Sequence, residues 1–331
     1  MSTLKSRRNI FQSTFAIASL GLLSVLTLPV AAQSWPTKPV KVVVPAPAGS
    51  SLDVIVRGLG ETLSKRWGQP LVVDNKPGAG GTIGTGYVAR ADADGSVMVM
   101  AAASHNIAGS LYNKLTYDPQ KDFAPLAHIG SASYVLMVHP DVPAKTAAEY
   151  IRYAKANPGK LTFASSGSGT SVHLSAVLFE KMAKIDMIHV PYKGTGSAMP
   201  DVISGQVDMS FPNLPSAVPQ VKAGNLRGLG VTTAKRSAAA PGIPTIAESG
   251  LPGYDMATWY GLVAPANLPV EIRNRLNKEL QSILADPKFK DKLIAQGADP
   301  MPGSPEQFSA FIKSEIEKWR KLIAQSQITV D

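Results

Sequence analysis

The sequence predicts an α/β protein in which parallel sheets are flanked by helices. Short apolar runs rich in β-branched residues recur along the chain, and helix-like stretches of about ten residues or more follow most of them. With 331 residues, 44% of them hydrophobic and 17% charged, the chain can bury a core in about two domains. The predicted strands are VKVVV (40–44), LVVD (71–74), VMVMAA (97–102), YVLMVH (134–139), LTFAS (161–165), MIHV (187–190) and LRGLGVT (226–232).

The first 32 residues are typical of an export signal. Lys5, Arg7 and Arg8 precede the apolar stretch 15–30, and small residues follow it, so we expect cleavage after Ala32 by the general secretory or the twin-arginine route. The stretch is interrupted by polar residues and is short for a membrane anchor. Without cysteine the mature chain can carry neither disulfide nor lipid anchor, which predicts a free periplasmic protein.

The net charge of +9 falls to +6 once the three cations of the leader are removed. The basic residues are scattered singly and no aromatic cluster accompanies them, which excludes a nucleic-acid-binding surface. A mildly positive surface favours anions. We therefore expect a small anion, and no nucleic acid, as the partner of this protein.

Two stretches have the same order of elements. PAPAGSSLD (45–53) follows the first strand and opens a helix with an apolar stripe, and Asp53 lies in its first turn, where it can accept backbone N–H bonds. SSGSGTSVH (165–173) likewise joins a strand to an amphipathic helix that starts after residue 171. Each helix start offers unsatisfied N–H groups, so two of them facing each other could hold a carboxylate. Two ordinary strand-to-helix turns are the alternative.

Proline and glycine concentrate in AAAPGIPTIAESGLPGYD, which is typical of a loop between lobes. We predict a first lobe of residues 33–133 and 254–331 and a second lobe of residues 134–253, so that two chain crossings form a hinge. The chain from Pro269 onward is helix-rich and charged, as in surface helices that wrap a domain.

Other site chemistries are less well supported. NKPGAGGTIGTG (75–86) has Ile83 where a dinucleotide fingerprint needs glycine, and no Lys-Ser/Thr pair follows, so no nucleotide cofactor is expected. The five histidines never pair at metal-ligand spacing. Ser166, His173 and Asp208 supply the residue types of a hydrolase triad, but no G-x-S-x-G elbow surrounds any serine. A secreted serine hydrolase using Ser166 and His173 is the alternative to a binding protein without catalysis.

Six stretches, in order along nearly the whole mature chain, closely resemble the Bug family of periplasmic solute-binding proteins, the receptors of tripartite tricarboxylate transporters. They are VVVPAPAGSSLD, VVDNKPGAGGTIGTGYVARADADG, YDPQKDFAPLAHIG, ANPGKLTFASSGSGTSVHL, HVPYKGTGSAMPDVISGQVDM and GIPTIAESGLPGYDMATWYGLVAPANLP.

The resemblance implies a two-lobed Venus-flytrap fold of the type II periplasmic-binding-protein class. Such a receptor closes on a small organic anion, often a carboxylate, and delivers it to the membrane subunits of the transporter. The resemblance also implies which loops clamp the ligand, and we expect the protein to act as a monomer. The implied ligand-binding residues are Ala46, Ala48, Gly49, Ser50 and Ser51, facing Ser166, Gly167, Thr170 and His173, with Ser104 and Asp208 as further candidates.

The first loop departs from the family pattern at three positions. Ala46, Ala48 and Ser50 stand where an aromatic residue, a proline and a glycine are usual, so we expect a wider pocket, one that could take an aromatic acid. Pro212 stands where an acid is usual, which removes the basis for selecting ligands that bear an amine. A receptor that has shifted to a signalling partner stays a further possibility.

Overall fold

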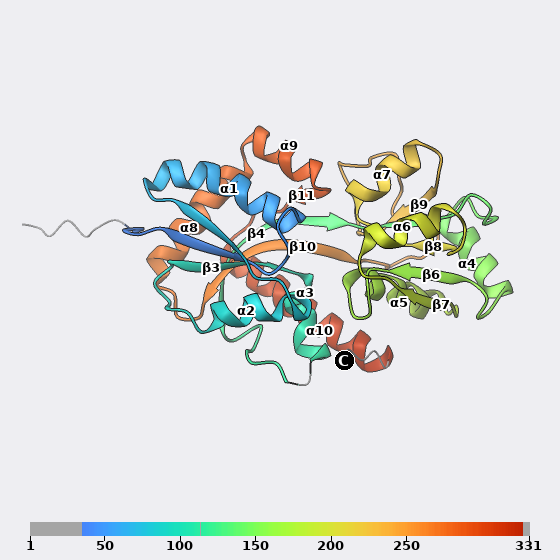
Figure 1. Ribbon diagram of the computed structural model, residues 1–331, viewed down its shortest axis with the longest axis horizontal. Helices are drawn as coiled ribbons and strands as arrows, with labels where there is room; N and C mark the ends of the chain where they lie inside the picture. The colour runs from blue at the N-terminus through green and yellow to red at the C-terminus, as the bar shows by residue number, and fades with distance from the viewer. Residues whose placement is uncertain (1–34, 113, 327–331) are drawn as a thin grey trace, which may run out of the picture.

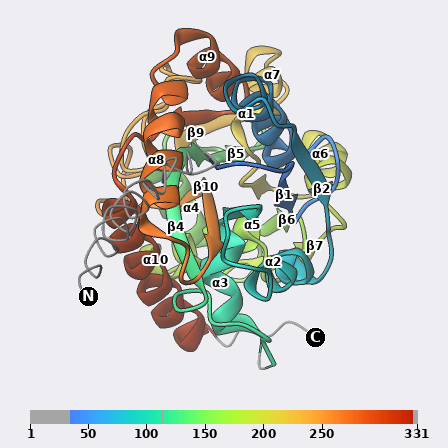
Figure 2. The same ribbon diagram turned by 90° about the vertical axis from the view of Figure 1, so that its left-hand side faces the viewer.

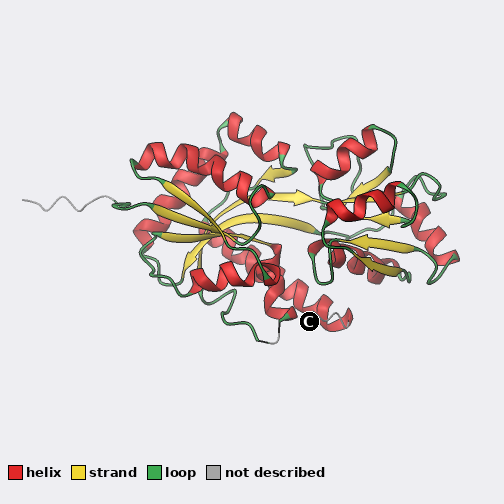
Figure 3. Cartoon of the chain, in the orientation of Figure 1, coloured by secondary structure: helices red, strands yellow, loops and turns green. Residues whose placement is uncertain are grey.

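The computed structural model describes residues 35–112 and 114–326, so the predicted leader and its cleavage after Ala32 lie outside the described residues. Two sheets lie side by side along the long axis of the molecule, each covered by helices on both faces (Figure 1; Figure 3). The α/β class is therefore confirmed.

The first sheet has six strands in the order β11-β4-β10-β3-β1-β2. The strand β1 is parallel to β2 and β3, whereas β10 and β11 pair antiparallel with their neighbours. The strands are β1 (Val40–Val44), β2 (Leu71–Asn75), β3 (Val97–Ala102), β4 (Phe123–Ser133), β10 (Ala257–Pro265) and β11 (Ala298–Pro300).

The helices of this half divide between the two faces of the first sheet. One buried cluster joins α1 (Ser51–Trp67), α8 (Val270–Leu284) and α9 (Pro287–Ala295) to one face. The other face carries α2 (Thr82–Ala89), which follows the 3₁₀ turn η1 (Ala79–Gly81), together with α3 (Ala103–Leu111) and α10 (Pro305–Ser326).

The second sheet has five strands in the order β7-β6-β8-β5-β9. They are β5 (Val135–Val138), β6 (Thr162–Ser165), β7 (Ile188–Pro191), β8 (Met209–Ser210) and β9 (Arg227–Val231). One face packs against α6 (Thr195–Ile203) and α7 (Leu214–Lys222), and the other against α4 (Ala147–Ala156) and α5 (Ser171–Ala183).

Both sheets are mixed rather than mostly parallel as we predicted. The difference arises because β5, β9 and β10 lead the chain between the sheets and run antiparallel to their neighbours. The strand β10 escaped detection because it is buried on both faces and shows no alternation of polar and apolar residues. The strand β4 was missed because Pro125 and Gly130 interrupt its apolar pattern.

The chain passes between the sheets at Tyr134 and again in the segment between β9 and β10. The two passages are bonded to each other: the Tyr134 amide donates to the Thr232 hydroxyl at 2.9 Å, and the Thr232 amide donates to the Tyr134 carbonyl at 3.0 Å. The Met256 amide donates to the Thr232 carbonyl at 2.8 Å. These bonds join the two passages, while the hinge and the domain boundaries at 133/134 and 253/254 stay predictions.

Candidate functional site

The first loop ends in a capped helix. Ser50 is the N-cap of α1, and its hydroxyl accepts the Asp53 amide at 3.4 Å. The Asp53 carboxylate accepts the Gly49 amide at 2.9 Å and the Arg57 guanidinium at 2.9 Å. Gly49 has a φ of 80°, a conformation that glycine adopts without strain. This arrangement is a variant of the capping box in which Asp53 accepts the amide of the residue before the N-cap, and the structural role that we expected for Asp53 is the one it has.

The second loop repeats this geometry. Thr170 is the N-cap of α5, and its hydroxyl accepts the His173 amide at 3.4 Å. The His173 ring accepts the Gly169 amide through Nδ1 at 3.0 Å, and Gly169 has a φ of 73°. Each loop therefore has glycine, a hydroxyl cap and a third-position acceptor. The acceptor is a carboxylate in α1 and an imidazole in α5. The two loops, which are similar in sequence, therefore also have similar structures.

The negative charge of the Asp53 carboxylate in the first loop is balanced by the Arg57 guanidinium. The Arg57 guanidinium holds the pKa of Asp53 below its ordinary value, helped by the Gly49 amide and opposed by burial of the carboxyl. Asp53 is 3% exposed, so its charge faces the protein and is paired there. The loop consequently does not present a free negative charge to an anion.

His173 is neutral at physiological pH. Burial, and then the neighbouring His189 ring, lower its pKa to about 4. Because Nδ1 accepts a bond from Gly169, the ring proton is on Nε2, which makes that atom a donor. The His189 ring stacks on His173 at 4.0 Å between centroids, and its Nε2 lies 2.6 Å from the Ser165 hydroxyl. The second loop thus offers neutral donors only.

The hydroxyl groups of the second loop bond mainly within it. The Ser166 hydroxyl donates to Thr170 Oγ1 at 3.1 Å, and the Thr170 hydroxyl donates to the Gly167 carbonyl at 2.7 Å. Gly167, with a φ of 125°, donates its amide to the Ser165 hydroxyl. These bonds fix the loop ahead of α5, and they bring Ser166, Gly167, Thr170 and His173 together as expected.

The predicted ligand-binding residues that follow strands of the first sheet also lie together, at one edge of that sheet. The Ala46 carbonyl accepts the Asn75 side chain at 3.1 Å, and Ala48 and Gly49 are exposed beside it. A Cβ placed on Gly81 would lie 3.3 Å from the Pro45 carbonyl and 3.6 Å from the Ser104 hydroxyl. Ser104, in the first turn of α3, therefore lies next to the first loop. The edge is formed by the carboxyl ends of β1 and β3, where ligands of α/β sheets bind.

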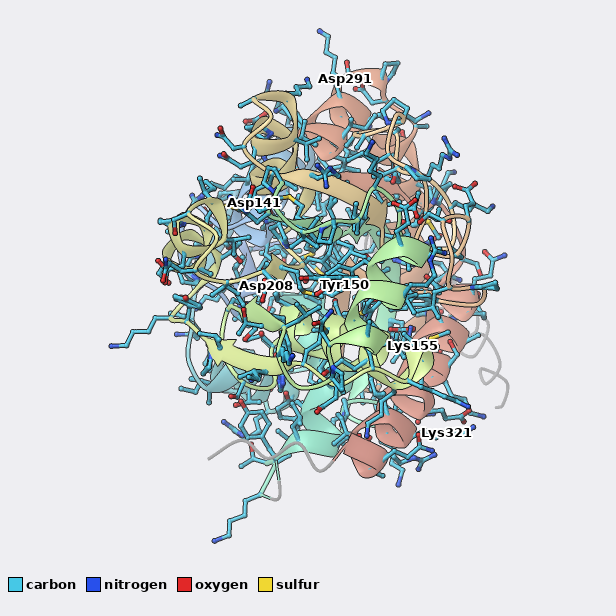
Figure 4. All side chains as sticks on the ribbon, turned by 90° about the vertical axis from the view of Figure 1, so that its right-hand side faces the viewer. Asp141, Tyr150, Lys155, Asp208, Asp291 and Lys321 are labelled. Atoms are coloured by element: carbon cyan, nitrogen blue, oxygen red, sulfur yellow. The ribbon has the colours of Figure 1, made fainter. Side chains whose placement is uncertain are left out.

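Asp208 does not join this group. Its carboxylate accepts the amide and the hydroxyl of Thr162 at 2.7 and 2.8 Å, at the start of β6, whereas the second loop follows the end of β6. Figure 4, drawn from the side of the second sheet, labels Asp208 there together with Asp141. We misplaced Asp208 because the sequence does not show which end of β8 it occupies, and we leave it out of the proposed site.

The hydrolase alternative is wrong. Ser166 bonds Thr170, the His173 Nδ1 is taken by Gly169, and Asp208 bonds Thr162, so the three residues form no proton relay. Within residues 35–112 and 114–326 no group of His, Asp and Glu is placed to hold a metal ion. None of the described helices is long and apolar enough to cross a membrane.

Two buried tyrosines that the sequence analysis did not assign to the site lie beside the starts of α1 and α5. Burial raises the pKa of Tyr260, on β10, and the nearby Ser51 hydroxyl opposes this rise. Burial likewise raises the pKa of Tyr134, and the nearby Ser171 and Thr258 hydroxyls oppose this rise. Ser51 and Ser171 are the first residues of α1 and α5. A charge on Tyr134 would also raise the pKa of Tyr260, so the two phenols are neighbours.

These contacts bring the starts of α1 and α5 to the same pair of tyrosines. The signal that could have revealed Tyr134 is an aromatic residue at the first predicted passage between the lobes, whereas Tyr260 lies within β10 and had no such signal. We read Tyr134 as an ordinary residue of the strand 134–139 and placed Tyr260 in no strand, because the sequence does not show which strands pass between the sheets.

His173 gives a testable pH dependence. Its pKa is about 4 in the folded protein against 6.5 in the unfolded chain, so the unfolded chain binds more protons between these values. The free energy of unfolding should therefore fall as the pH decreases through this window. From about pH 7 to about pH 5, His173 should contribute a loss of about 1–2 kcal/mol.

The measurement is urea denaturation of the wild-type protein and of His173→Asn, which keeps an acceptor for Gly169 but does not titrate. We expect the wild-type protein to lose more stability than the variant. Equal losses in the two proteins would contradict a buried neutral His173.

Comparison with known proteins identifies relatives along almost the whole chain. The family model described as "Tripartite tricarboxylate transporter family receptor" matches residues 55–328. Protein BugT of Bordetella pertussis is 33% identical over 94% of this chain and 94% of its own length.

Two solved structures of Rhodopseudomonas palustris proteins are similar in sequence and fold. Rpa4515 with adipate is 36% identical, with a TM-score of 0.78 over 89% of this chain and 99% of that one. MatC with bound malate is 30% identical, with a TM-score of 0.73 over 87% and 99% of the two chains. Both ligands are dicarboxylates.

Proposed function

The chain belongs to the family of tripartite tricarboxylate transporter receptors, and on that premise we propose that it binds a small dicarboxylate between the starts of α1 and α5. One carboxylate of the ligand accepts backbone N–H groups from both helices and the proton of the Ser50 hydroxyl in the first loop. The hinge lets the two lobes close on the ligand, and the closed receptor delivers it to the transporter's membrane subunits.

The observation that carries this proposal is the pair of matching helix starts. Capping satisfies the amides of the glycine and of the third helical residue in each loop, and it leaves the first two amides of each helix without an acceptor among the described residues. Such amides are donors for an anion, strengthened by the helix dipole. The amides in question belong to Ser51, Leu52, Ser171 and Val172.

Neutral donors suit a transport receptor. Backbone and hydroxyl dipoles can hold a carboxylate without burying an arginine, whose desolvation costs several kcal/mol, on the order of the gain from the pair. They also avoid an ion pair that would slow release. The compensated Asp53 and the neutral His173 keep both loops free of net charge.

The ligand class follows from the relatives together with the site. Rpa4515 and MatC bind adipate and malate, so a dicarboxylate of similar size is the first candidate here. Ala46 and Ala48 leave room beside the first loop, which keeps aromatic acids in the panel to be tested. The Ser50 hydroxyl accepts the Asp53 amide and can still donate its own proton to a ligand.

The proposal also covers the cellular location and the oligomeric state of the protein. The receptor family is one of periplasmic proteins, so we propose that residues 1–32 direct export and that the mature chain works as a monomer in the periplasm. The ligand-binding residues proposed are those brought together at the two loops, with Tyr134 at the first passage between the sheets and Tyr260 on β10.

A thermal-shift panel tests the ligand class. A ligand present at about 100 times its Kd adds about 2.7 kcal/mol of stability, which raises the Tm of a chain of this size by about 4 °C. We expect such a rise with adipate, malate or an aromatic dicarboxylate, and none with the uncharged 1,6-hexanediol. Asp208→Ala should lower the Tm but keep the ligand-dependent rise. A rise with hexanediol and with no carboxylate would refute the proposal.

A further inference from the structure

The strand β2 forms one edge of the first sheet, and half of its backbone groups face outward. The Val40 amide donates to Pro70 and the Lys76 amide donates to Val44, so Pro70, Val72, Asp74 and Lys76 turn their backbone groups toward β1. The intervening residues Leu71, Val73 and Asn75 point theirs away. Of these outward groups only the Leu71 amide has a partner in the described chain, the Ser64 hydroxyl at 2.9 Å.

Three large apolar side chains lie exposed beside this edge. Val72 on β2 is 43% exposed, and Ile83 and Tyr87, one turn apart on α2, are 57% and 40% exposed. Lys41, the register partner of Val72, lies 5.8 Å from the centre of the Tyr87 ring, which places Val72 and Tyr87 on the same face of the sheet. We call Val72, Ile83, Tyr87 and the outward backbone of β2 the edge surface.

The edge surface carries a positive charge. Lys76 lies 4.9 Å from the centre of the Tyr87 ring, and Lys41 and Lys76 both approach Asp74, at 3.6 and 3.3 Å. One carboxylate between two ammonium groups leaves one positive charge uncompensated. Two copies of this surface would therefore repel each other, whereas an acidic strand would be attracted.

We propose that the edge surface docks an extended, acidic segment of the transporter's membrane subunits, which adds a strand beside β2. The backbone of Val73 and Asn75 would bond the added strand, Val72 and Tyr87 would contact its apolar side chains, and Lys41 and Lys76 would face its carboxylate. This inference rests on the proposed delivery function but uses a surface distinct from the ligand loops. Figure 2 shows β2 and α2 on the outside of the molecule.

An exposed edge strand otherwise invites aggregation, and charged residues on it are the usual protection. Here the charges are combined with exposed apolar residues rather than replacing them, which is typical of an interaction site. The surface is thus suited to a partner that is both apolar and acidic.

The test compares two valines of similar exposure. Val72→Glu places an acid in the edge surface, while Val270→Glu places one at Val270, which is 50% exposed at the start of α8. The binding of each protein is measured on proteoliposomes that carry the two membrane subunits of a tripartite tricarboxylate transporter from the same genome, and on empty liposomes. Both the ligand-free and the dicarboxylate-loaded receptor are measured.

We expect Val72→Glu to weaken binding to the subunits at least tenfold and Val270→Glu to bind like the wild-type protein. The dicarboxylate-dependent rise in Tm, unchanged in both variants, shows that they are folded. The proposal is overturned if Val72→Glu binds like the wild type, if the wild type binds empty liposomes equally well, or if β2 instead pairs two copies in a dimer that Val72→Glu dissociates. Docking without any carboxylate-induced rise would instead refute the proposed ligand while leaving the docking surface supported.

Discussion

Replacing Ser171 with aspartate is expected to weaken dicarboxylate binding at least a hundredfold without destabilising the protein. Ser171 is the first residue of α5, so an added carboxylate would lie beside the same free amides that we propose for the ligand. Two like charges about 4 Å apart repel by about 4 kcal/mol at an effective dielectric constant near 20. Each 1.4 kcal/mol corresponds to about a tenfold change in affinity. The repulsion is therefore large enough to account for more than the hundredfold loss that we expect.

The stability of this variant should not fall, because the gain from the new acid at the helix start offsets the loss of the Ser171 hydroxyl beside Tyr134. An acid in the first turn of a helix interacts favourably with the helix dipole, by about 0.3–1 kcal/mol. A binding defect accompanied by an equal or higher Tm therefore cannot result from unfolding. Titration calorimetry with adipate or malate, together with thermal denaturation, gives both quantities.

Two controls isolate the charge and its position. Ser171→Asn has nearly the same shape as the aspartate variant without its charge, and it should lose less than tenfold in affinity. Val270→Asp adds an acid at the start of α8, away from both loops, and should bind like the wild-type protein. Ser171→Asp binding within tenfold of the wild type would place the ligand elsewhere.

Trp319→Ala is expected to lower the free energy of unfolding by about 3–5 kcal/mol, the usual cost of removing a buried tryptophan side chain. Trp319 is fully buried on α10, in the apolar cluster that continues from the first sheet into the second. Its indole also donates to the Glu315 carboxylate at 3.0 Å, so truncation leaves a cavity and removes a donor from a buried acid.

Urea denaturation of three variants separates these effects. Trp319→Phe keeps most of the packing but loses the indole N–H, and should cost about 1–2 kcal/mol. Arg320→Ala, at the exposed next position of the same helix, should change stability by less than about 0.5 kcal/mol. If Trp319→Ala cost no more than Arg320→Ala, α10 could not be packed into the shared core as the structure has it.

Many strands and helices of the fold could be predicted from local sequence patterns. The strands β1, β2, β3, β5, β6, β7 and β9 and the helices α1 and α5 lie where apolar runs and helical periodicity predicted them, within a few residues. The loop between β9 and β10 was also expected from its proline and glycine. These features depend on neighbouring residues along the chain, which is why the sequence reveals them.

The candidate site, too, could be predicted from the sequence only in part. The sequence alone determined the family, the α/β class and the two similar loops, since capping joins residues that are three or four positions apart. Only the tertiary structure decided that the two helix starts approach the same buried pair, Tyr134 and Tyr260, and that Asp208 lies away from them. Strand order, strand direction and the approach of residues more than a hundred positions apart depend on packing of the whole chain, which no local pattern encodes.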